Sequence, residues 1–253
     1  MLSRLGVPHA FSTRIGGVSP APFDSLNLGN PSGVKVQDQW DRVYENYTRL
    51  QSAMGCPEHS RCWVHQVHGG DVIRVAHNGE FKSGQRADAL VSDDTRRLLA
   101  VRVADCVPIL LASDDGKVVA AIHSGWRGVI ANVVGNTIKT LIAMDLPAER
   151  LTAAIGPCIG KLAFEVGPEV IEAFEQAFGN EGAAAVVKRN ADGNGSVNLR
   201  EAVRIQLLSG GVPEDRIDST DRCTAFHKDE FFSHRRDKGM TGRMAAMIAP
   251  RGT

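Results

Sequence analysis

The chain lacks a charge excess of either sign, because its 253 residues carry 29 Lys and Arg against 29 Asp and Glu. No global field therefore favours nucleic acid or an anionic membrane as a partner. It also lacks an apolar run approaching the roughly 18 to 20 residues that span a bilayer. The N-terminus lacks the basic-then-apolar pattern of a signal peptide. We expect a cytoplasmic protein that acts on a small molecule, with no nucleic-acid or membrane partner. The sequence predicts no particular oligomeric state.

Standard metal and disulfide motifs are also missing. The five cysteines form no Cys-x-x-Cys pair, and no His-Glu-x-x-His sequence occurs. An odd number of widely spaced thiols predicts a reduced protein. The cysteines are Cys56, Cys62, Cys106, Cys158 and Cys223. A metal site can therefore be argued here from residue types alone, because no diagnostic interval is present.

The hydrophobic content of 43% is sufficient for a substantial core. Segments typical of strands alternate with segments of helical periodicity, and no linker interrupts them, which favours a single mixed α/β domain over residues 1–253. We expect helices over 36–54, 128–144, 168–178 and 199–208, with Asn198 as the N-cap of the last one. We expect strands over 62–67, 71–75, 98–111, 117–122, 151–155 and 244–249, the first two joined as a hairpin at Gly69-Gly70.

The hairpin predicted around Asp114-Asp115-Gly116 brings Cys106 near His123. If the turn centres on Asp114-Asp115, Cys106 lies opposite His123, whereas centring on Asp115-Gly116 makes His123 a diagonal neighbour, still within side-chain reach. Either register places both side chains on one face. Pro108 predicts a bend or bulge just after Cys106, because proline cannot donate to a strand ladder.

Three interpretations of Cys106 and His123 remain open at this point. They are a metal site, a nucleophile with its base, or a buried thiol beside a histidine bonded to backbone. Adding His68 gives three ligands and one open position, the pattern of catalytic zinc. His65 lies three residues before His68 and would face the opposite side of a strand.

Four other motifs bear on the function. Residues 190–201 nearly match a calcium loop, although a surface turn is the simpler interpretation. The helix start at 124–128, with Arg127, could bind an anion such as phosphate. Arg235 and Arg236 could do the same, or could form an Arg–Asp network with Asp237. Cys158, in the turn 156–160, is predicted to be an inert buried thiol.

Nine motifs, taken together, resemble the bacterial laccase-domain family, also described as multicopper polyphenol oxidases or peptidoglycan editing factors. They cover nearly the whole chain in order: FSTRIGGVS (11–19), SLNLG (25–29), QVHG (66–69), ADALV (87–91), ADCVP (104–108), HSGWRG (123–128), IGPCI (155–159), SHRRD (233–237) and TGR (241–243). The chain departs from the family at Ser124, where many members have Ala.

The resemblance implies an α/β/β/α layered fold like that of cytotoxic necrotizing factor catalytic domains. It also implies zinc held by His68, Cys106 and His123, with copper as the alternative metal. The implied activities are phosphorolysis of adenosine, inosine and methylthioadenosine and deamination of adenosine, so nucleoside and phosphate are the expected partners. We place Arg14, Asn27 and Arg127 near the site as candidate contacts for substrate or phosphate.

Two further activities are alternatives. Copper-dependent polyphenol oxidation is disfavoured in its four-copper form, because that chemistry needs many histidines and the chain has eight. A cysteine-dependent hydrolase or editing factor would use Cys106 as nucleophile and His123 as base on a peptidoglycan precursor. Zinc deamination, in contrast, needs only one site with an open position.

Overall fold

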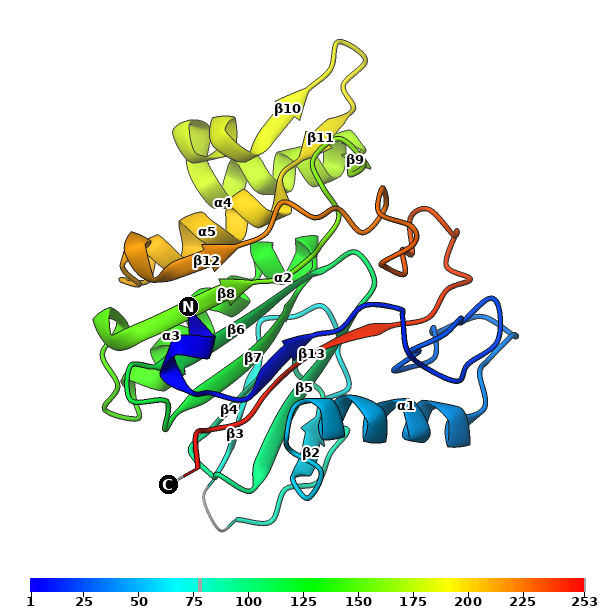
Figure 1. Ribbon diagram of the computed structural model, residues 1–253. Helices are drawn as coiled ribbons and strands as arrows, with labels where there is room; N and C mark the ends of the chain where they lie inside the picture. The colour runs from blue at the N-terminus through cyan, green and yellow to red at the C-terminus, as the bar shows by residue number, and fades with distance from the viewer. Residues whose placement is uncertain (77–78, 253) are drawn as a thin grey trace.

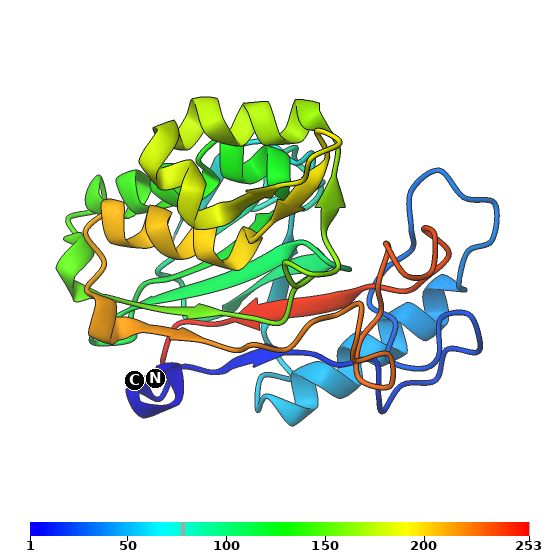
Figure 2. The same cartoon turned by 90° about the horizontal axis from the view of Figure 1, so that it is seen from above.

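The computed structural model, which describes residues 1–76 and 79–252, has two stacked sheets with helices on both outer faces (Figure 1, Figure 2). The four-stranded sheet has the order β1-β13-β5-β2, and the six-stranded sheet has the order β12-β8-β6-β7-β4-β3. The α/β/β/α layering is therefore confirmed. The strands are β1 (His9–Phe11), β2 (Ser60–Trp63), β3 (Val72–Val75), β4 (Ala89–Ser92), β5 (Arg97–Val103), β6 (Val107–Ser113), β7 (Val119–Ser124), β8 (Leu151–Ile155), β12 (Ile217–Ser219) and β13 (Met244–Ile248).

The helices segregate to the two outer layers. Helix α1 (Trp40–Ala53) covers the four-stranded sheet, whereas α2 (Trp126–Ile130), α3 (Val133–Ile142), α4 (Pro168–Val186) and α5 (Leu199–Ser209) lie over the six-stranded sheet (Figure 2). A small third sheet has the order β10-β11-β9, from Val187–Arg189, Gly195–Val197 and Glu165–Val166. Single turns of 3-10 helix occur at Leu2–Leu5, Ala148–Arg150 and Glu214–Arg216. No helix in the described ranges is long and apolar enough to cross a membrane.

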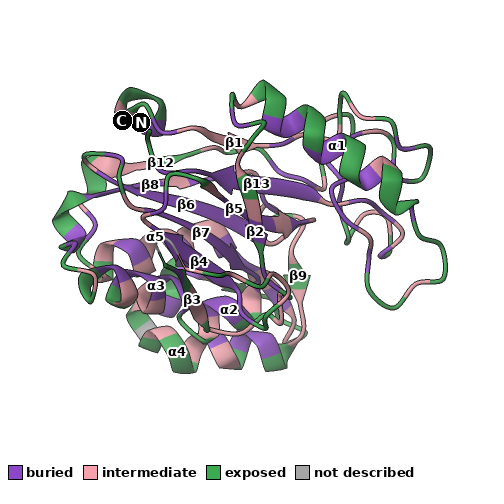
Figure 3. Ribbon diagram, turned by 90° about the horizontal axis from the view of Figure 1, so that it is seen from below, coloured by how far each residue is buried: buried purple, intermediate pink, exposed green. Residues whose placement is uncertain are grey.

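The sequence of β6 shows why it is central. All seven of its residues are buried, as Figure 3 shows for the middle strands. Ile109 and Leu111 pack in the core beneath the helices, and Leu110 and Ala112 pack in the core between the two sheets. A strand with apolar side chains on both faces can bury all of them only when it lies between two other layers. Burying one Leu or Ile side chain contributes about 1.5–3 kcal/mol to stability.

Helix α1 follows from its periodicity. Val43, Tyr47 and Leu50 recur on one face and pack against Leu98 and Met247 of the four-stranded sheet. The opposite face is exposed (Figure 3). The predicted helix over 36–54 is confirmed, with its start at Trp40.

Three local predictions differ from the structure. Residues 98–111 form two strands in different sheets, because the chain turns at Asp105, whose φ is 89°, and Pro108 lies inside β6 opposite His123. Strands β2 and β3 also belong to different sheets, so no hairpin forms at Gly69-Gly70. The helix predicted over 128–144 is two helices, separated at Asn132 in the left-handed conformation.

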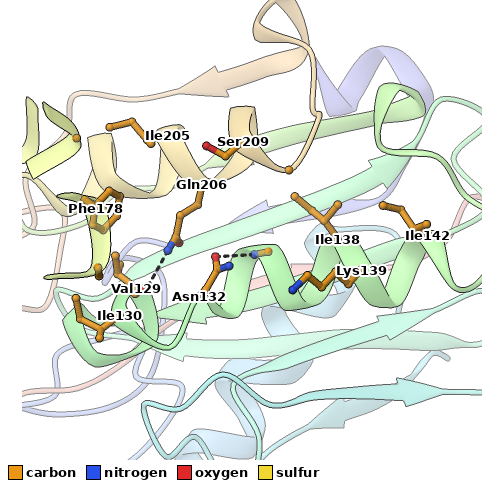
Figure 4. A pocket seen from close by; sticks show the side chains of 14 residues that line it. Val129, Ile130, Asn132, Ile138, Lys139, Ile142, Phe178, Ile205, Gln206 and Ser209 are labelled. Carbon is orange, nitrogen blue, oxygen red and sulfur yellow. Dashed lines mark hydrogen bonds between the residues drawn. The ribbon is translucent and has the colours of Figure 1, made fainter. Parts of the chain in front are cut away.

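A mostly apolar cavity lies between the helices. It has a volume of about 520 Å³ and lies between α2, α3, α4 and α5, where Ile138, Ile142, Phe178 and Ile205 are among the lining side chains (Figure 4). Among the described residues, no histidine, cysteine or carboxylate lines it. Lys139 is the one ionisable side chain among the described lining residues, and the metal-ligating groups are found elsewhere.

Candidate metal centre and active site

Three segments bring His68, Cys106 and His123 together. His123 is near the end of β7, Cys106 directly precedes β6, and His68 lies in the turn before β3. Their ligand atoms all lie within 4.8 Å of one another. Pro108 pairs with His123, so Cys106 is the diagonal neighbour and the hairpin centres on Asp115-Gly116. Within the described ranges, this is the one group of three or more ligating side chains.

A single carboxylate, that of Asp88, orients both histidines. His123 Nδ1 lies 2.7 Å from Asp88 Oδ1, which leaves the other ring nitrogen for the site. The same carboxylate accepts backbone N–H bonds from Val67, His68 and Gly69, at 3.1, 3.0 and 2.6 Å. These bonds hold His68 in the left-handed conformation, with φ 59°. A buried carboxylate behind a histidine is the usual support of a metal ligand.

A glycine makes room for the cluster. A Cβ at Gly125 would lie 2.9 Å from both Cys106 Sγ and His68 Cδ2. Real Cβ atoms do not approach so closely, so any larger residue here would push the thiol and the imidazole apart. The Gly125 backbone is extended, with φ −79°, so the requirement is for space and not for conformation.

Asp105 holds the corner that presents Cys106. Its Oδ1 accepts from Thr224 Oγ1 at 2.6 Å, and its Oδ2 accepts from the backbone N–H of Arg235 at 2.7 Å. Its carbonyl accepts from the backbone N–H of Ile159. A non-glycine residue at φ 89° costs of order 1–3 kcal/mol. The three contacts offset that cost and fix the position of Cys106.

The histidines change the ionisation of the thiol. Burial raises the pKa of Cys106, but His123 and then His68 outweigh it and lower the pKa to about 6. Burial in turn lowers the pKa of His123, but Cys106 and Asp88 outweigh it and raise the pKa to about 9. The metal-free site thus favours a thiolate beside an imidazolium. In contrast, burial raises the pKa of Cys158 to about 11, in line with the predicted inert thiol.

The donor set fits a zinc ion. Zinc prefers thiolate and imidazole ligands, and three protein ligands leave one position open for substrate or water. Cys106 Sγ and His68 Nε2 lie 3.9 Å apart, which is close to the separation of two ligands around one tetrahedral ion, about 3.5 Å. Cys106 is half-buried and His68 is exposed, so the open position faces solvent.

The three residues lie in a cavity of about 380 Å³ whose lining residues are mainly polar. Its other polar side chains are mainly basic or amide groups, and Asp105 is the one carboxylate among the described lining residues. The basic and amide side chains are Asn30, His65, Gln66, Arg102, His234, Arg235 and Arg243. The cavity is therefore cationic, although the chain as a whole is neutral.

The three predicted substrate contacts do not line this cavity. Asn27 is fully buried, where its amide donates to Asp38 Oδ2 and accepts from the backbone of Arg243. Arg14 pairs with Asp24 and lies over the Phe232 ring. Arg127 is exposed and stacks on its neighbour Trp126. Their roles toward substrate stay predictions.

The two arginines of SHRRD have different roles. Arg236 pairs with Asp237 at 2.7 Å and donates to two backbone carbonyls, which is the predicted Arg–Asp network. Arg235 lines the cavity and donates to the Glu165 carbonyl. The calcium-loop residues form a hairpin end, where Asn198 caps α5 by accepting from the Glu201 N–H.

The sequence alone assigned no role to Asp88 and Gly125, which support the cluster, or to Arg102 and Arg243, which line its cavity. Asp88, Gly125 and Arg243 lie in motifs quoted above, ADALV, HSGWRG and TGR, so a closer look at the unassigned positions of those motifs could have found them. Arg102 has no such signal, because it lies in an ordinary strand sequence.

Comparison with known families places the chain. The family model described as multi-copper polyphenol oxidoreductase laccase matches residues 8–251. The chain belongs to this family. Members with similar sequences are named purine nucleoside phosphorylases: YfiH of Escherichia coli is 42% identical over 96% of this chain and 93% of the relative, and the Shigella flexneri protein YfiH has the same values.

Two solved structures share the architecture. YlmD from Geobacillus stearothermophilus is 33% identical and has a TM-score of 0.87, over 98% of this chain and 93% of that one. The Bacillus licheniformis protein YfiH is 28% identical, with a TM-score of 0.88 over 97% and 93% of the two chains. The layered fold described here is thus shared with these two proteins.

Proposed function

We propose that this protein is a zinc-dependent purine nucleoside phosphorylase that also deaminates adenosine. The observation that carries the proposal is the His68, Cys106 and His123 cluster in a cationic cavity. The names of its relatives support phosphorolysis. Adenosine, inosine and methylthioadenosine are the proposed nucleosides, and phosphate is the second substrate.

His68, Cys106 and His123 would hold the zinc ion. Bound there, zinc supplies Lewis acidity at one open position. Asp88 keeps the Nδ1 proton on His123, so that the other ring nitrogen is free to coordinate. The Cys106 thiol is already disposed to ionise, which lowers the cost of binding a cation at neutral pH.

Phosphorolysis requires charge stabilisation and one proton transfer. A phosphate oxygen forms a bond to C1′ of the ribose, the C1′–N9 bond breaks, and its electron pair remains on the purine, which takes up a proton. The products are ribose 1-phosphate and the free base. The cavity's guanidinium groups hold the phosphate charge, and His65 or His234, which also line it, can give the purine its proton. Deamination converts adenosine and water to inosine and ammonia.

The test incubates zinc-replete protein with inosine, adenosine or methylthioadenosine, each with and without phosphate, and separates the products by chromatography. From inosine we expect hypoxanthine and ribose 1-phosphate in equal amounts, only when phosphate is present. Formation of free ribose, or of no product from any of the three nucleosides, would contradict the phosphorylase function.

A second candidate function has its own supporting observation. Cys106, His123 and Asp88 lie in the order of nucleophile, base and orienting carboxylate, and the lowered pKa of Cys106 suits a nucleophile. A cysteine-dependent hydrolase or editing factor for peptidoglycan precursors would use them without metal. Chelation separates the two functions, because it abolishes zinc-dependent turnover but frees the thiolate for attack. The same donors accept copper, so copper-loaded protein should also be assayed for phenol oxidation.

A further inference from the structure

Two arginines reach the cavity from adjacent strands of the four-stranded sheet. Arg102 is in β5, and Arg243 directly precedes β13. Arg102 pairs with Ala245 in the antiparallel register, so Arg243 is its diagonal neighbour on the same face. Diagonal neighbours lie roughly 7–8 Å apart, within reach of two long side chains. Both side chains line the cavity that contains Cys106.

Neither guanidinium is neutralised within the described part of the chain. Arg243 Nη1 donates to the carbonyls of Thr241 and Gly242, both at 3.0 Å, and makes no ion pair there. Arg102 lies over the Trp63 ring, with Cζ 5.6 Å from the centroid, and likewise has no carboxylate partner. Asp105, the acid in this cavity, already accepts from Thr224 and from the backbone of Arg235.

The fold holds the two positively charged side chains of Arg102 and Arg243 close together, although they repel each other. Burial lowers the pKa of Arg243, and the charge of Arg102 adds to this effect, while Cys106 and Asp105 act in the opposite direction. A Cβ at Gly29 would lie 2.9 Å from Arg102 Cδ, so a glycine there lets the side chain pass. The buried amide of Asn27 accepts from the Arg243 N–H at 2.9 Å and fixes that backbone. Two half-buried cations that form no ion pair with a carboxylate in the described part of the chain indicate an anionic ligand.

We propose that Arg102 and Arg243 bind inorganic phosphate beside Cys106. Guanidinium groups recognise tetrahedral oxyanions through paired N–H donors, and two of them match the charge of a phosphate dianion. The proposal rests on the proposed function for the identity of the anion, and it names the residues that hold the second substrate. The helix start with Arg127 is the competing location, but α2 has five residues and Arg127 does not line the cavity.

The test is calorimetric titration of the zinc-replete protein with inorganic phosphate. Arg102→Gln and Arg243→Gln should each raise the Kd for phosphate at least tenfold, and the KM for phosphate in parallel, while the KM for inosine changes less than twofold. Arg49→Gln is the matched control, because Arg49 pairs with Glu45 on the exposed face of α1. Its phosphate Kd should equal that of the wild type.

The outcomes separate this site from the proposed function. If the wild type binds phosphate and both variants lose this binding, but the wild type does not turn over inosine, the anion site is supported and the phosphorylase function is contradicted. If the wild type and both variants turn over inosine with the same phosphate KM, the phosphorylase function is supported and the proposed anion site is wrong. The site is also wrong if only Arg127→Gln raises the Kd for phosphate tenfold. Zinc content and thermal melting identify a variant that has simply lost its fold. Arg102→Lys and Arg243→Lys then serve in its place, with a weaker loss expected.

Discussion

The Oδ1 atom of Asp88 lies 2.7 Å from Nδ1 of His123, and the same carboxylate binds the backbone of the His68 turn. One buried side chain thus sets the ring orientation of one ligand and the backbone conformation of another. The site depends on Asp88 as much as on the ligands themselves.

Asp88→Asn should weaken zinc binding while leaving the chain folded. The amide cannot accept from all four N–H groups, and it removes the charge that keeps the Nδ1 proton on His123. Loss of such a support costs roughly 10- to 100-fold in metal affinity, and the unsatisfied donors cost about 1–3 kcal/mol of stability. Competition with a zinc chelator measures the affinity, and unchanged affinity would show that Asp88 does not position the ligands.

Gly125→Ala should damage the site by steric conflict alone. The new methyl group would meet Cys106 Sγ and His68 Cδ2 at 2.9 Å, so the ligands must separate and zinc occupancy should fall. Gly128→Ala is the matched control in the same segment, because its nearest contact would be an ordinary 3.5 Å. Equal zinc content in the two variants, measured by elemental analysis, would rule out the close approach described here.

Alkylation of metal-free protein should depend on pH with a midpoint near 6 at Cys106. The thiolate is the reactive form, and its fraction rises as the pH increases through about 6. Cys158 should not react below pH 9, because its pKa is raised to about 11. Iodoacetamide labelling followed by mass spectrometry measures both thiols in one sample. A midpoint near 9 at Cys106 would mean that the histidines do not favour its thiolate.

His68→Ala should abolish zinc binding, whereas His65→Ala should leave it intact. His68 is one of the three clustered ligands, but His65 forms a backbone β-bridge with Arg86 and belongs to no such cluster. Zinc content of the two variants measures the difference. Equal losses would mean that the ligand set is wrongly assigned.

A mixed α/β domain could be predicted because its strands are short and apolar and its helices are periodic, whereas the α/β/β/α layering was implied by the family resemblance. Helix α1 and the β6–β7 hairpin follow from local pattern and turn chemistry. The break at Asp105 could not be predicted. An unbroken apolar run does not reveal whether it forms one strand or two strands in different layers, and Thr224 and Arg235, which hold the break, lie more than 100 residues away.

The metal ligands could be found only in part from local reasoning. Strand register brought His123 to Cys106, but His68 depended on family resemblance, because its position is set by Asp88, 20 residues further along. Arg102 and Arg243 were missed for the same reason. Their proximity arises from pairing of β5 with β13, which the sequence order does not indicate.

Zinc content across a pair of cysteine variants tests the central claim most directly. In protein purified without added metal, elemental analysis should find one zinc per chain in the wild type and in Cys158→Ala. Cys106→Ala should have far less zinc and no turnover, with a melting temperature close to that of the wild type, because Cys106 is half-buried at a cavity and not in the core. Full zinc and full turnover in Cys106→Ala would contradict the assignment of the site.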